Sequence, residues 1–541
     1  MKLSLESITA GQWKATDVRL PQWDMAAMRE RTRRHPLWLH FGAGNIFRAL
    51  IACQQQDLID EGHCERGIIV AETFDPEIIE KIYKPHDDLS VAVFMHPDGQ
   101  LDKRLVASVA ESVETVTDPA GFLRVKEIFE EPGLQLVSFT ITEKGYALKG
   151  ISGDWLPAIA RDMEEGPQSP QGVIAIATAG LYSRFINDAG PLALVSLDNC
   201  SKNGEKLGEA VTTMARAWHD GGFVSAAFLD YLEDPARISF PWSMIDKITP
   251  QPDASVQGRL SSMGIEGMKS IRTSKNTFIA PFVNAEVPEY LVIEDSFPNG
   301  RPPLEKAGTL FTDRHSVEQA EKMKVTTCLN PLHTALAIMG CLLGYTSIAD
   351  EMANPLLREL VERIGYDEGL PVVPESKILD PRRFIKEVIE QRLPNPFIPD
   401  TPQRIAIDTS QKIVVRFGET IKSYVKRPDL DPASLNFIPL VIAVWFRYLL
   451  GLDDQLQVME IASDPLAPEL SDKLQGISPN DPSSYQGELI PLLKNETLFG
   501  SDLTEIGLAE KIENYFIDML RGPGSIETLL EKLIARAREE K

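Results

Sequence analysis

One short segment in the second half of the chain holds an acid, a lysine, an amide and an imidazole. Glu321 and Lys324 are three residues apart, which places them on one face of an expected helix. Pro331 suits the first turn of a new helix, so Asn330 is expected to cap that helix and His333 to lie within its first turn. Taken singly, Asn330 is better explained as a cap and Lys324 as a solvated lysine. Together with His333, these two residues are expected to converge near a positive helix end.

A second polar segment, 196–204, directly follows an apolar run and contains Asn199. Ligands bind at the carboxyl ends of strands in parallel sheets, so Asn199 is a candidate ligand-binding residue. An asparagine-rich turn or helix cap is the alternative, and it would be the preferred one if the segment stood alone.

A third segment carries the cations Arg404, Lys412 and Arg416. These side chains suit the binding of substrate oxygens or of a carboxylate. A solvated basic face is an equally good interpretation of this segment by itself.

A Gly-x-Gly motif follows an expected strand and precedes an expected helix. In a nucleotide-binding unit Gly42 makes the tight turn and Gly44 lets the backbone approach a pyrophosphate, with Asn45 and Ile46 opening the helix beneath it. The third glycine of the usual fingerprint is missing, and Ala49 is the nearest small residue. Glycines also occur in ordinary turns, but the strand before and the helix after favour a dinucleotide site.

Glu72 ends the next apolar run. An acid at this point binds the adenosine ribose hydroxyls and repels a 2′-phosphate, so the sequence predicts NAD rather than NADP. A solvated carboxylate at the end of a strand is the alternative, and Asp75 is a near competitor.

The first part of the chain alternates short apolar runs with helical periodicity. This alternation predicts βαβ units, a mainly parallel sheet and an α/β Rossmann-like N-terminal domain over residues 1–305. The expected strands lie at 36–41, 67–71, 89–94, 134–141, 173–177 and 193–197.

The remaining residues, 306–541, show helical periodicity separated by proline-rich connectors such as 393–396. An all-α C-terminal domain is therefore expected. Its expected helices lie at 317–328, 331–343, 348–364, 381–392, 439–450, 506–519 and 526–541.

Composition narrows the function classes. A chain of 541 residues favours two or three domains. The formal charge of −24 would repel phosphate backbones and anionic lipid, so neither nucleic acid nor a membrane is an expected partner. Five dispersed cysteines without a Cys-x-x-Cys pair indicate reduced intracellular thiols.

The same composition gives no sign of a membrane segment or a metal site. The N-terminal residues lack an apolar stretch of signal-peptide length, and the apolar run 437–446 is too short to span a bilayer, so a core helix and a cytoplasmic protein are expected. No His/Cys cluster has metal-ligand spacing, which predicts a metal-independent protein. The sequence does not indicate an oligomeric state.

Several ordered motifs resemble the polyol-specific long-chain dehydrogenase family, which includes mannitol 2-dehydrogenase, fructuronate reductase and tagaturonate reductase. The similarity covers nearly the whole chain. The motifs are FGAGNIFRA (41–49), TITEKGY (140–146), SLDNCSKNG (196–204), FPWSMIDKITP (240–250) and VIEDSFPNGRP (292–302).

The resemblance implies an NAD-dependent dehydrogenase that interconverts a secondary alcohol and a ketone. It implies that Lys324 is the general base of alcohol oxidation and that Asn199 and Asn330 hold the substrate oxygen. The resemblance also implies that His333, Arg404 and Lys412 contact the substrate. Glu321 would assist proton exchange with solvent, and Asp246 would line the site.

Three positions depart from the family pattern. Five residues, 325–329, separate the lysine from the asparagine where four are usual. Pro331 replaces a small residue, and Lys247 stands where arginine is usual. The extra residue must bulge out if Lys324 is to reach the site.

The implied chemistry is self-consistent. A lysine can replace a metal if burial and the nearby nicotinamide cation lower its pKa from ~10.4 towards neutrality. Two neutral amides then form an oxyanion hole worth roughly 3–4 kcal/mol per donor.

The substrate is expected to be either an uncharged polyol or ketose, or a hexuronate. Spare cations in an acidic protein favour the D-fructuronate/D-mannonate pair, with mannitol 2-dehydrogenase or tagaturonate reductase activity as alternatives. A non-catalytic NAD-binding scaffold is the alternative of another class. A sugar-nucleotide enzyme would need a further phosphate cradle, which the sequence does not show.

Overall fold

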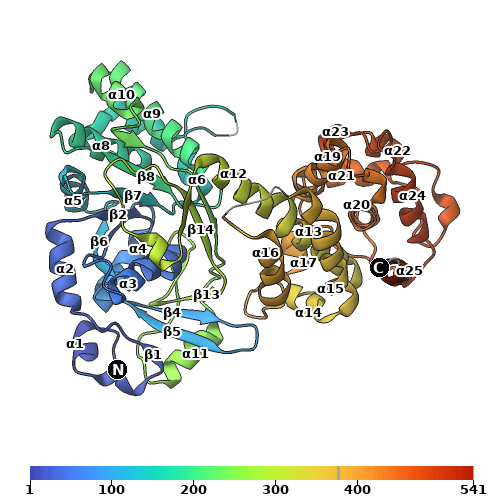
Figure 1. Cartoon of the computed structure of the whole chain (residues 1–541), viewed down its shortest axis with the longest axis horizontal. Coiled ribbons are helices and arrows are strands. Elements are labelled where there is room, and N and C mark those ends of the chain that lie inside the picture. Colours follow the sequence, from blue (N-terminus) through green and yellow to red (C-terminus); the bar gives the residue numbers. More distant parts are fainter. Residues whose placement is uncertain (151, 374–377, 540–541) are drawn as a thin grey trace. The chain divides into compact units, whose positions relative to one another are not determined.

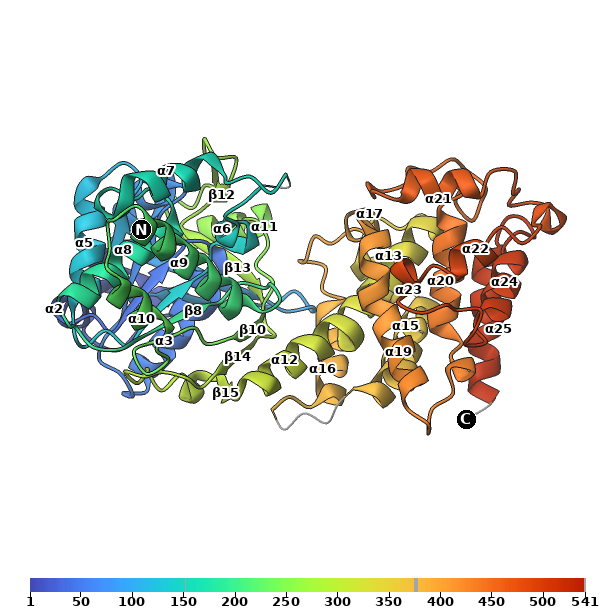
Figure 2. The same ribbon diagram turned by 90° about the horizontal axis from the view of Figure 1, so that it is seen from above.

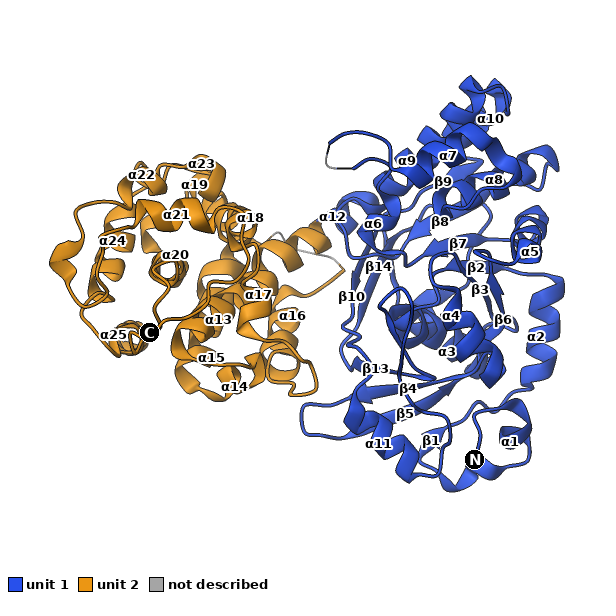
Figure 3. Cartoon of the chain, turned by 180° about the vertical axis from the view of Figure 1, so that it is seen from behind, with its two compact units in different colours: residues 1–318 blue, residues 319–541 orange. Residues whose placement is uncertain are grey.

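The computed structural model describes residues 1–150, 152–373 and 378–539, and the chain forms two compact units, 1–318 and 319–541 (Figure 3). The boundary lies later than the predicted 305/306. The difference arises because β15 (Leu310–Thr312) pairs with β14 (Tyr290–Glu294), and Arg314 then forms an ion pair with Glu294. Residues 306–318 therefore belong to the first unit.

The centre of the first unit is a six-stranded parallel sheet (Figure 1) in the order β6-β3-β2-β7-β8-β9, with each strand labelled in Figure 3. Successive strands leave β2 in both directions, so the order reverses between β2 and β7, which is where doubly wound sheets bind dinucleotides. The predicted Rossmann-like fold is confirmed. The strands are β2 (Trp38–Phe41), β3 (Ile68–Glu72), β6 (Val109–Glu114), β7 (Leu136–Phe139), β8 (Leu192–Ser196) and β9 (Ile238–Ser239).

Both faces of this sheet are covered. Leu39 and Phe41 pack in one apolar core with residues of α5 (Pro119–Glu130), α8 (Val173–Ile186) and α9 (Asn203–Asp220). Trp38 belongs to the other core, with residues of α3 (Ala52–Asp60). Because both faces are buried, β2, β3 and β8 are apolar along almost their whole length.

Two expected strands, 89–94 and 173–177, are not part of the six-stranded sheet. The run 89–94 does form β4 (Ser90–Met95), but β4 belongs to a separate four-stranded sheet. Its order is β1 (Val18–Arg19), β5 (Leu101–Val106), β4 and β13 (Phe282–Glu286). The expected strand at 173–177 is wrong, since these residues open helix α8. A short apolar run buried on all sides has no periodicity that separates helix from strand.

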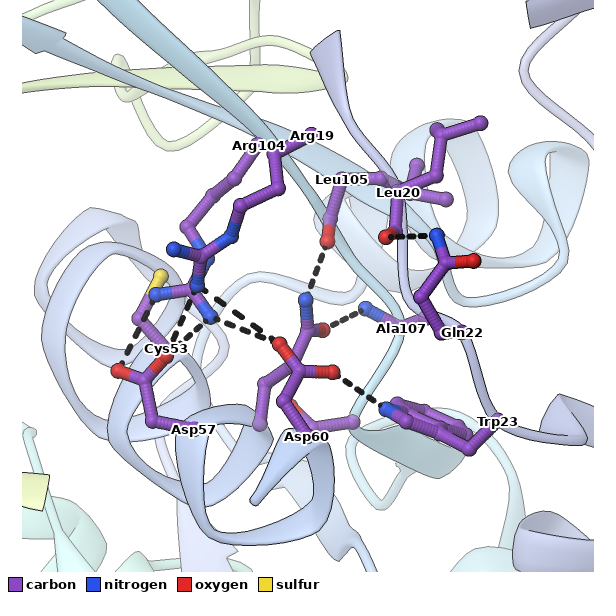
Figure 4. A network of polar contacts seen from close by, with 12 residues as sticks. Arg19, Leu20, Gln22, Trp23, Cys53, Asp57, Asp60, Arg104, Leu105 and Ala107 are labelled. Atoms are coloured by element: carbon purple, nitrogen blue, oxygen red, sulfur yellow. Dashed lines mark hydrogen bonds and ion pairs between the residues drawn. The ribbon is translucent and has the colours of Figure 1, made fainter. Parts of the chain in front are cut away.

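A polar network fixes the N-terminal strand β1 (Val18–Arg19) to α3 (Figure 4). Asp57 accepts hydrogen bonds from Arg19 at 3.0 Å and from Arg104 at 2.7 Å. The Trp23 indole donates to Asp60 at 2.6 Å. These contacts anchor the segment that precedes the main sheet.

The described part of the second unit is helical, as predicted, and matches the expected all-α domain. The buried helix α20 (Phe437–Tyr448) packs against α13 (Asn330–Leu343) and α24 (Ala509–Asp518) (Figure 2). Other predicted helices correspond to α12 (Arg314–Met323) with η7 (Lys324–Cys328), α16 (Pro381–Glu387) with η10 (Val388–Arg392), and α25 (Ser525–Glu539).

The predicted single helix at 348–364 is divided. It forms α14 (Ile348–Ala353) and α15 (Pro355–Glu362), followed by a π-helical turn, η8 (Arg363–Gly369). The division falls where the Asn354 side chain caps α15 by accepting from the N–H of Leu356, and where Pro355 starts the new helix.

One helical run among the described residues, Arg314–Leu343, is long and apolar enough to cross a membrane by length and composition alone. Within it, 78% of the most apolar window is buried inside the structure. The run is thereby accounted for as a core helix of the protein.

Candidate active site

The loop after β2 has the geometry of a dinucleotide-binding turn. Gly42 has a φ of +108°, and its N–H donates to the carbonyl of Ala71 at 2.9 Å. A Cβ atom on Gly42 would lie 2.3 Å from the carbonyl oxygen of Thr140. Only glycine fits this position, which lies at the carboxyl end of β2 between its two parallel neighbours.

The second glycine opens onto free space. A Cβ atom on Gly44 would meet no atom within 4 Å, so the backbone there is accessible to a ligand. The helix begins at Asn45 and continues through Ile46 into a π-helical turn, η2 (Phe47–Ile51). An open glycine beside a helix N-terminus is the arrangement that a pyrophosphate requires, so these residues fit the expected cofactor.

Asn45 also fixes this loop to the rest of the unit. Its amide donates to the carbonyl of Pro250 at 3.2 Å, and its oxygen accepts from the buried guanidinium of Arg48 at 2.8 Å. Arg48 donates in turn to the carbonyl of Ala280 at 2.7 Å. The Asn45 side chain thus holds the turn in place.

Glu72 is buried, and its carboxylate binds backbone groups. One oxygen accepts from the N–H of Ala43 at 2.9 Å. The other accepts from the N–H groups of Thr73, Phe74 and Asp75 at 3.0, 2.8 and 3.2 Å. Burial raises its pKa, and the four N–H donors oppose this rise. Glu72 therefore links the glycine turn to the loop after β3.

Asn199 lies exposed in the loop after β8, at the same edge of the sheet as the glycine turn. Its neighbours shape this loop. Asp198 accepts from the N–H groups of Ile141 and Thr142, both at 2.9 Å. Asn203 is buried and donates to the carbonyl of Ser243 at 2.9 Å. Asp198 and Asn203 thus shape the loop that carries the exposed Asn199.

Asp246 ends β10 (Ser243–Asp246), is buried, and lies opposite Tyr290 in the antiparallel pair with β14. The next residue, Lys247, has a fully buried side chain. Its Nζ donates to Glu289 at 2.9 Å and lies 4.9 Å from the ring centroid of Phe94. Lys247 at the arginine position is thus held by a structural ion pair.

In the second unit, Lys324 stands where an α-helix becomes a π-helix. Helix α12 ends at Met323, and the π-helical turn η7 begins with Lys324, which is only 2% exposed. A π-helical turn holds one residue more than the corresponding α-helical turn, so η7 accommodates the extra residue that the sequence predicts to bulge. Glu321 is half-buried in the last turn of α12.

The expected capping role of Asn330 is wrong, because Leu329 is the N-cap of α13 and Asn330 is its first helical residue. The helix starts one residue earlier than Pro331 alone suggests, and Pro331 is still tolerated in the first turn. The backbone N–H of His333 donates to the carbonyl of Leu329 at 3.0 Å. His333 lies in the first turn, as predicted.

Positive charges surround His333. Its imidazole is 18% exposed and lies 3.4 Å from a carboxylate oxygen of Asp400, which also pairs with Arg404. Burial, together with the charges of Arg416, Arg404 and Arg392, lowers the pKa of His333 to about 3. The imidazole is therefore neutral at physiological pH, and the positive charge resides on the guanidinium groups. We call His333, Arg392, Arg404 and Arg416 the cationic cluster.

Two further features belong to this region. Arg416, in the π-helical turn η11 (Val414–Gly418), donates to the hydroxyl of Thr334, and burial lowers its pKa to about 10. Lys412 donates to the carbonyl of Ile407 at 2.5 Å, and its pKa is lowered by burial and by Arg416. Arg404 lowers the pKa of Lys412 as well, while Asp408 and Asp464 oppose this effect.

Sequence analysis missed Arg392, Thr334 and Asp400 in this region. Arg392 and Asp400 flank the proline-rich connector at 393–396, which has the composition of a linker. Across the described ranges 1–150, 152–373 and 378–539, no group of three or more His, Cys, Asp or Glu side chains has an arrangement suited to a metal ion.

Comparisons with known proteins cover nearly the whole chain. The model of the mannitol dehydrogenase Rossmann domain matches residues 37–306, and that of the mannitol dehydrogenase C-terminal domain matches residues 316–520. A D-mannonate oxidoreductase of Thermotoga maritima is 51% identical over 99% of both chains. A mannitol 2-dehydrogenase of Aspergillus fumigatus is 31% identical over 86% of both.

Solved structures show the same fold at lower identity. The mannitol 2-dehydrogenase of Pseudomonas fluorescens, in a ternary complex with NAD and D-mannitol, superposes with a TM-score of 0.69 at 24% identity, covering 99% of this chain and 100% of that one. A D-sorbitol dehydrogenase in substrate-free form superposes with a TM-score of 0.75 at 22% identity, covering 95% and 98%.

Proposed function

This chain belongs to the mannitol dehydrogenase family, and on that premise we propose that it is an NAD-dependent dehydrogenase that interconverts D-fructuronate and D-mannonate. The relative at 51% identity is a D-mannonate oxidoreductase, which favours a sugar acid over an uncharged polyol. We place this chain in the cytoplasm, because its five dispersed cysteines lack a Cys-x-x-Cys pair and suit reduced intracellular thiols.

The cationic cluster is the observation that carries the choice of substrate. The protein has a formal charge of −24, which disfavours an anionic ligand over most of its surface. The charges of Arg392, Arg404 and Arg416 nevertheless all lower the pKa of His333, and Asp400 pairs with Arg404 among them. Arginine binds carboxylates in a bidentate manner, and a hexuronate differs from a ketose by its carboxylate. The cluster supplies the local charge that this group requires.

The catalytic roles follow from side-chain chemistry. Lys324 takes the hydroxyl proton when the alcohol is oxidised and returns it when the ketone is reduced. The amides of Asn199 and Asn330 donate to the substrate oxygen, and Glu321 exchanges the proton with solvent. NAD, when bound, supplies the hydride acceptor. Gly42, Gly44, Asn45 and Ile46 hold its pyrophosphate, while His333, Arg404, Lys412 and Asp246 contact the remaining substrate oxygens.

The test compares NADH oxidation with fructuronate, tagaturonate and fructose. We expect fructuronate to be the preferred substrate, and we expect Arg416→Met to raise KM for the hexuronate at least tenfold, since a charge-assisted hydrogen bond contributes about 1.5–3 kcal/mol. Arg521→Met, at an exposed position of the same unit, is the matched control. Preferential reduction of fructose, or an unchanged KM in Arg416→Met, would overturn the proposal.

A further inference from the structure

We propose that Tyr146 is a positioning residue for the reaction, because its hydroxyl fixes, through Asp198, the loop that carries the Asn199 amide. The inference rests on the proposed function in taking Asn199 to hold the substrate oxygen. It concerns the loops that follow β7 and β8, which are neighbouring parallel strands of the main sheet. Loops at the carboxyl ends of such strands line the ligand site, so a bond that joins them bears on the substrate.

The Tyr146 hydroxyl joins the segment after β7 to the end of β8. Tyr146 is the last residue of α6 (Thr142–Tyr146) and is 6% exposed. Its hydroxyl donates to a carboxylate oxygen of Asp198 at 2.6 Å and shares a hydrogen bond of 2.7 Å with the hydroxyl of Ser196, the last residue of β8. Burial and the charge of Asp198 raise the pKa of Tyr146 well above its usual range, so the hydroxyl remains a donor.

The Asp198 carboxylate is held by three donors from one segment. The oxygen that accepts from Tyr146 also accepts from the N–H of Ile141 at 2.9 Å. The other oxygen accepts from the N–H of Thr142 at 2.9 Å. Because both oxygens are bound, the carboxylate is held in one orientation and ties the loop after β8 to the loop after β7.

The backbone of Asp198 is fixed on its other side. Its carbonyl accepts from the N–H of Cys200 at 2.9 Å and from the amide of Asn203, the first residue of α9, at 3.0 Å. Asn199 therefore lies between anchored residues. An exposed side chain on a loop is placed only as precisely as its backbone, so these bonds set the position of the Asn199 amide.

The backbone of Thr142 shows that the loop after β7 is held against its local preference. Thr142 has a φ of +63°, in the left-handed region that strains a β-branched residue. Such a conformation persists only where the surrounding contacts impose it. Because the N–H of Thr142 binds the Asp198 carboxylate, loss of the hydroxyl that orients this carboxylate should let both loops relax.

The variant Tyr146→Phe tests the inference in the full chain, since it removes the hydroxyl and keeps the ring, which packs in an apolar core of the first unit. We expect kcat for ketone reduction to fall at least tenfold, because a misplaced oxyanion-hole donor is costly. Tyr231→Phe is the matched control. Tyr231 is also 6% exposed, but its hydroxyl donates to the carbonyl of Gly190 at 3.2 Å, ahead of β8, so this variant should keep the wild-type kcat.

A double-mutant cycle with Asn199→Ala separates positioning from a merely structural role. If Tyr146 acts through the Asn199 amide, Tyr146→Phe should change kcat by less than about twofold once that amide is absent. A merely structural role would lower kcat by the same factor in both backgrounds. That result, or an unchanged kcat in Tyr146→Phe alone, would overturn the inference.

Hydrogen exchange reports on the loops without turnover. The N–H groups of Ile141 and Thr142 should exchange faster in Tyr146→Phe than in the wild type or in Tyr231→Phe, and equal rates would also overturn the inference. The cycle uses whichever ketone the wild type reduces, so a preference for fructose would refute the hexuronate assignment alone. A wild type that binds NADH but reduces no ketone would refute the proposed function, while the exchange rates would still decide whether the hydroxyl fixes the loop.

Discussion

At the scale of single residues, the proposed chemistry depends on one buried amine. Lys324→Ala should lower kcat by a factor of ~10²–10⁴, the usual contribution of a general acid or base. NADH should still bind, because the glycine turn that holds the cofactor lies in the other unit. Steady-state kinetics and a fluorescence titration on the same sample measure both properties.

Lys322→Ala is the matched control for this prediction, since Lys322 is exposed and precedes the π-helical turn. Near-normal turnover in Lys324→Ala would assign proton transfer to another group. If the wild-type protein binds NADH but reduces neither hexuronates nor ketoses, the non-catalytic scaffold gains support.

Glu351 makes stability depend on pH. Both its carboxyl oxygens are buried, pack against Gly340, and have no hydrogen-bond partner among the residues that the structure describes. Burial raises the pKa of Glu351 from 4.5 to about 9. Between these pH values the folded chain holds a proton that the unfolded chain releases. The free energy of unfolding therefore falls as pH rises from about 4.5 to about 9, by at most about 1.4 kcal/mol per pH unit.

The variant Glu351→Gln cannot ionise at this position. Its thermal stability should resemble that of the wild type near pH 5 and exceed it increasingly up to pH 9, as measured by Tm against pH. Glu531→Gln, at an exposed position, should follow the wild type throughout. Parallel Tm profiles for Glu351→Gln and the wild type would contradict a protonated buried carboxyl.

At the scale of elements, the N-terminus of helix α20 is capped by a side chain that lies far from it in the sequence. Asn436, its N-cap, makes no side-chain capping bond. The Glu368 carboxylate, from η8, instead accepts from the N–H groups of Asn436, Phe437 and Ile438 at 2.5, 2.7 and 2.7 Å. A buried anion at a helix N-terminus satisfies donors that would otherwise be lost.

Removing this cap should destabilise the second unit. We expect Glu368→Ala to lower the free energy of unfolding by about 2–3 kcal/mol. This exceeds the effect of an exposed cap, because two buried N–H groups and one part-buried N–H group lose their partner. Urea denaturation followed by circular dichroism measures the change. Glu362→Ala, at a less buried position of the preceding helix, is the control, and equal effects in the two variants would argue against the capping role.

Much of the fold follows from the sequence because local pattern and burial agree. The apolar runs of β2, β3 and β8 and the glycines after β2 predict the sheet and its nucleotide-binding turn. The helical structure of 173–177 could not be predicted, because a fully buried apolar run has the same composition in a helix as in a strand.

The site could be predicted only in part. Lys324, His333 and Arg404 are candidates from their segments and stay predictions, while the extra residue before Asn330 predicted the irregular turn that η7 forms. The hydrogen bond from the N–H of Ala43 to Glu72 and the effect of the Arg392 charge on His333 arise from tertiary contacts between distant segments. Spacing along the chain carries no information on such contacts.

At the scale of the whole molecule, the chain consists of two compact units, and the first holds the residues proposed to bind the cofactor. A ligand stabilises the unit that binds it by mass action, by about 2.7 kcal/mol at a hundred times its Kd. Calorimetry should therefore resolve two unfolding transitions. NADH should raise the temperature of the transition that belongs to residues 1–318 more than that of the other.

Gly42→Ala provides the control for this assignment, because the added Cβ would lie 2.3 Å from the carbonyl of Thr140 and distort the nucleotide-binding turn. The transition of residues 1–318 should then occur at a lower temperature and no longer respond to NADH, while the second transition remains. Partial proteolysis at intermediate temperature identifies which unit unfolds in which transition. A single transition that NADH shifts as a whole would show that the two units unfold cooperatively, and an NADH response that survives in Gly42→Ala would move the cofactor away from this turn.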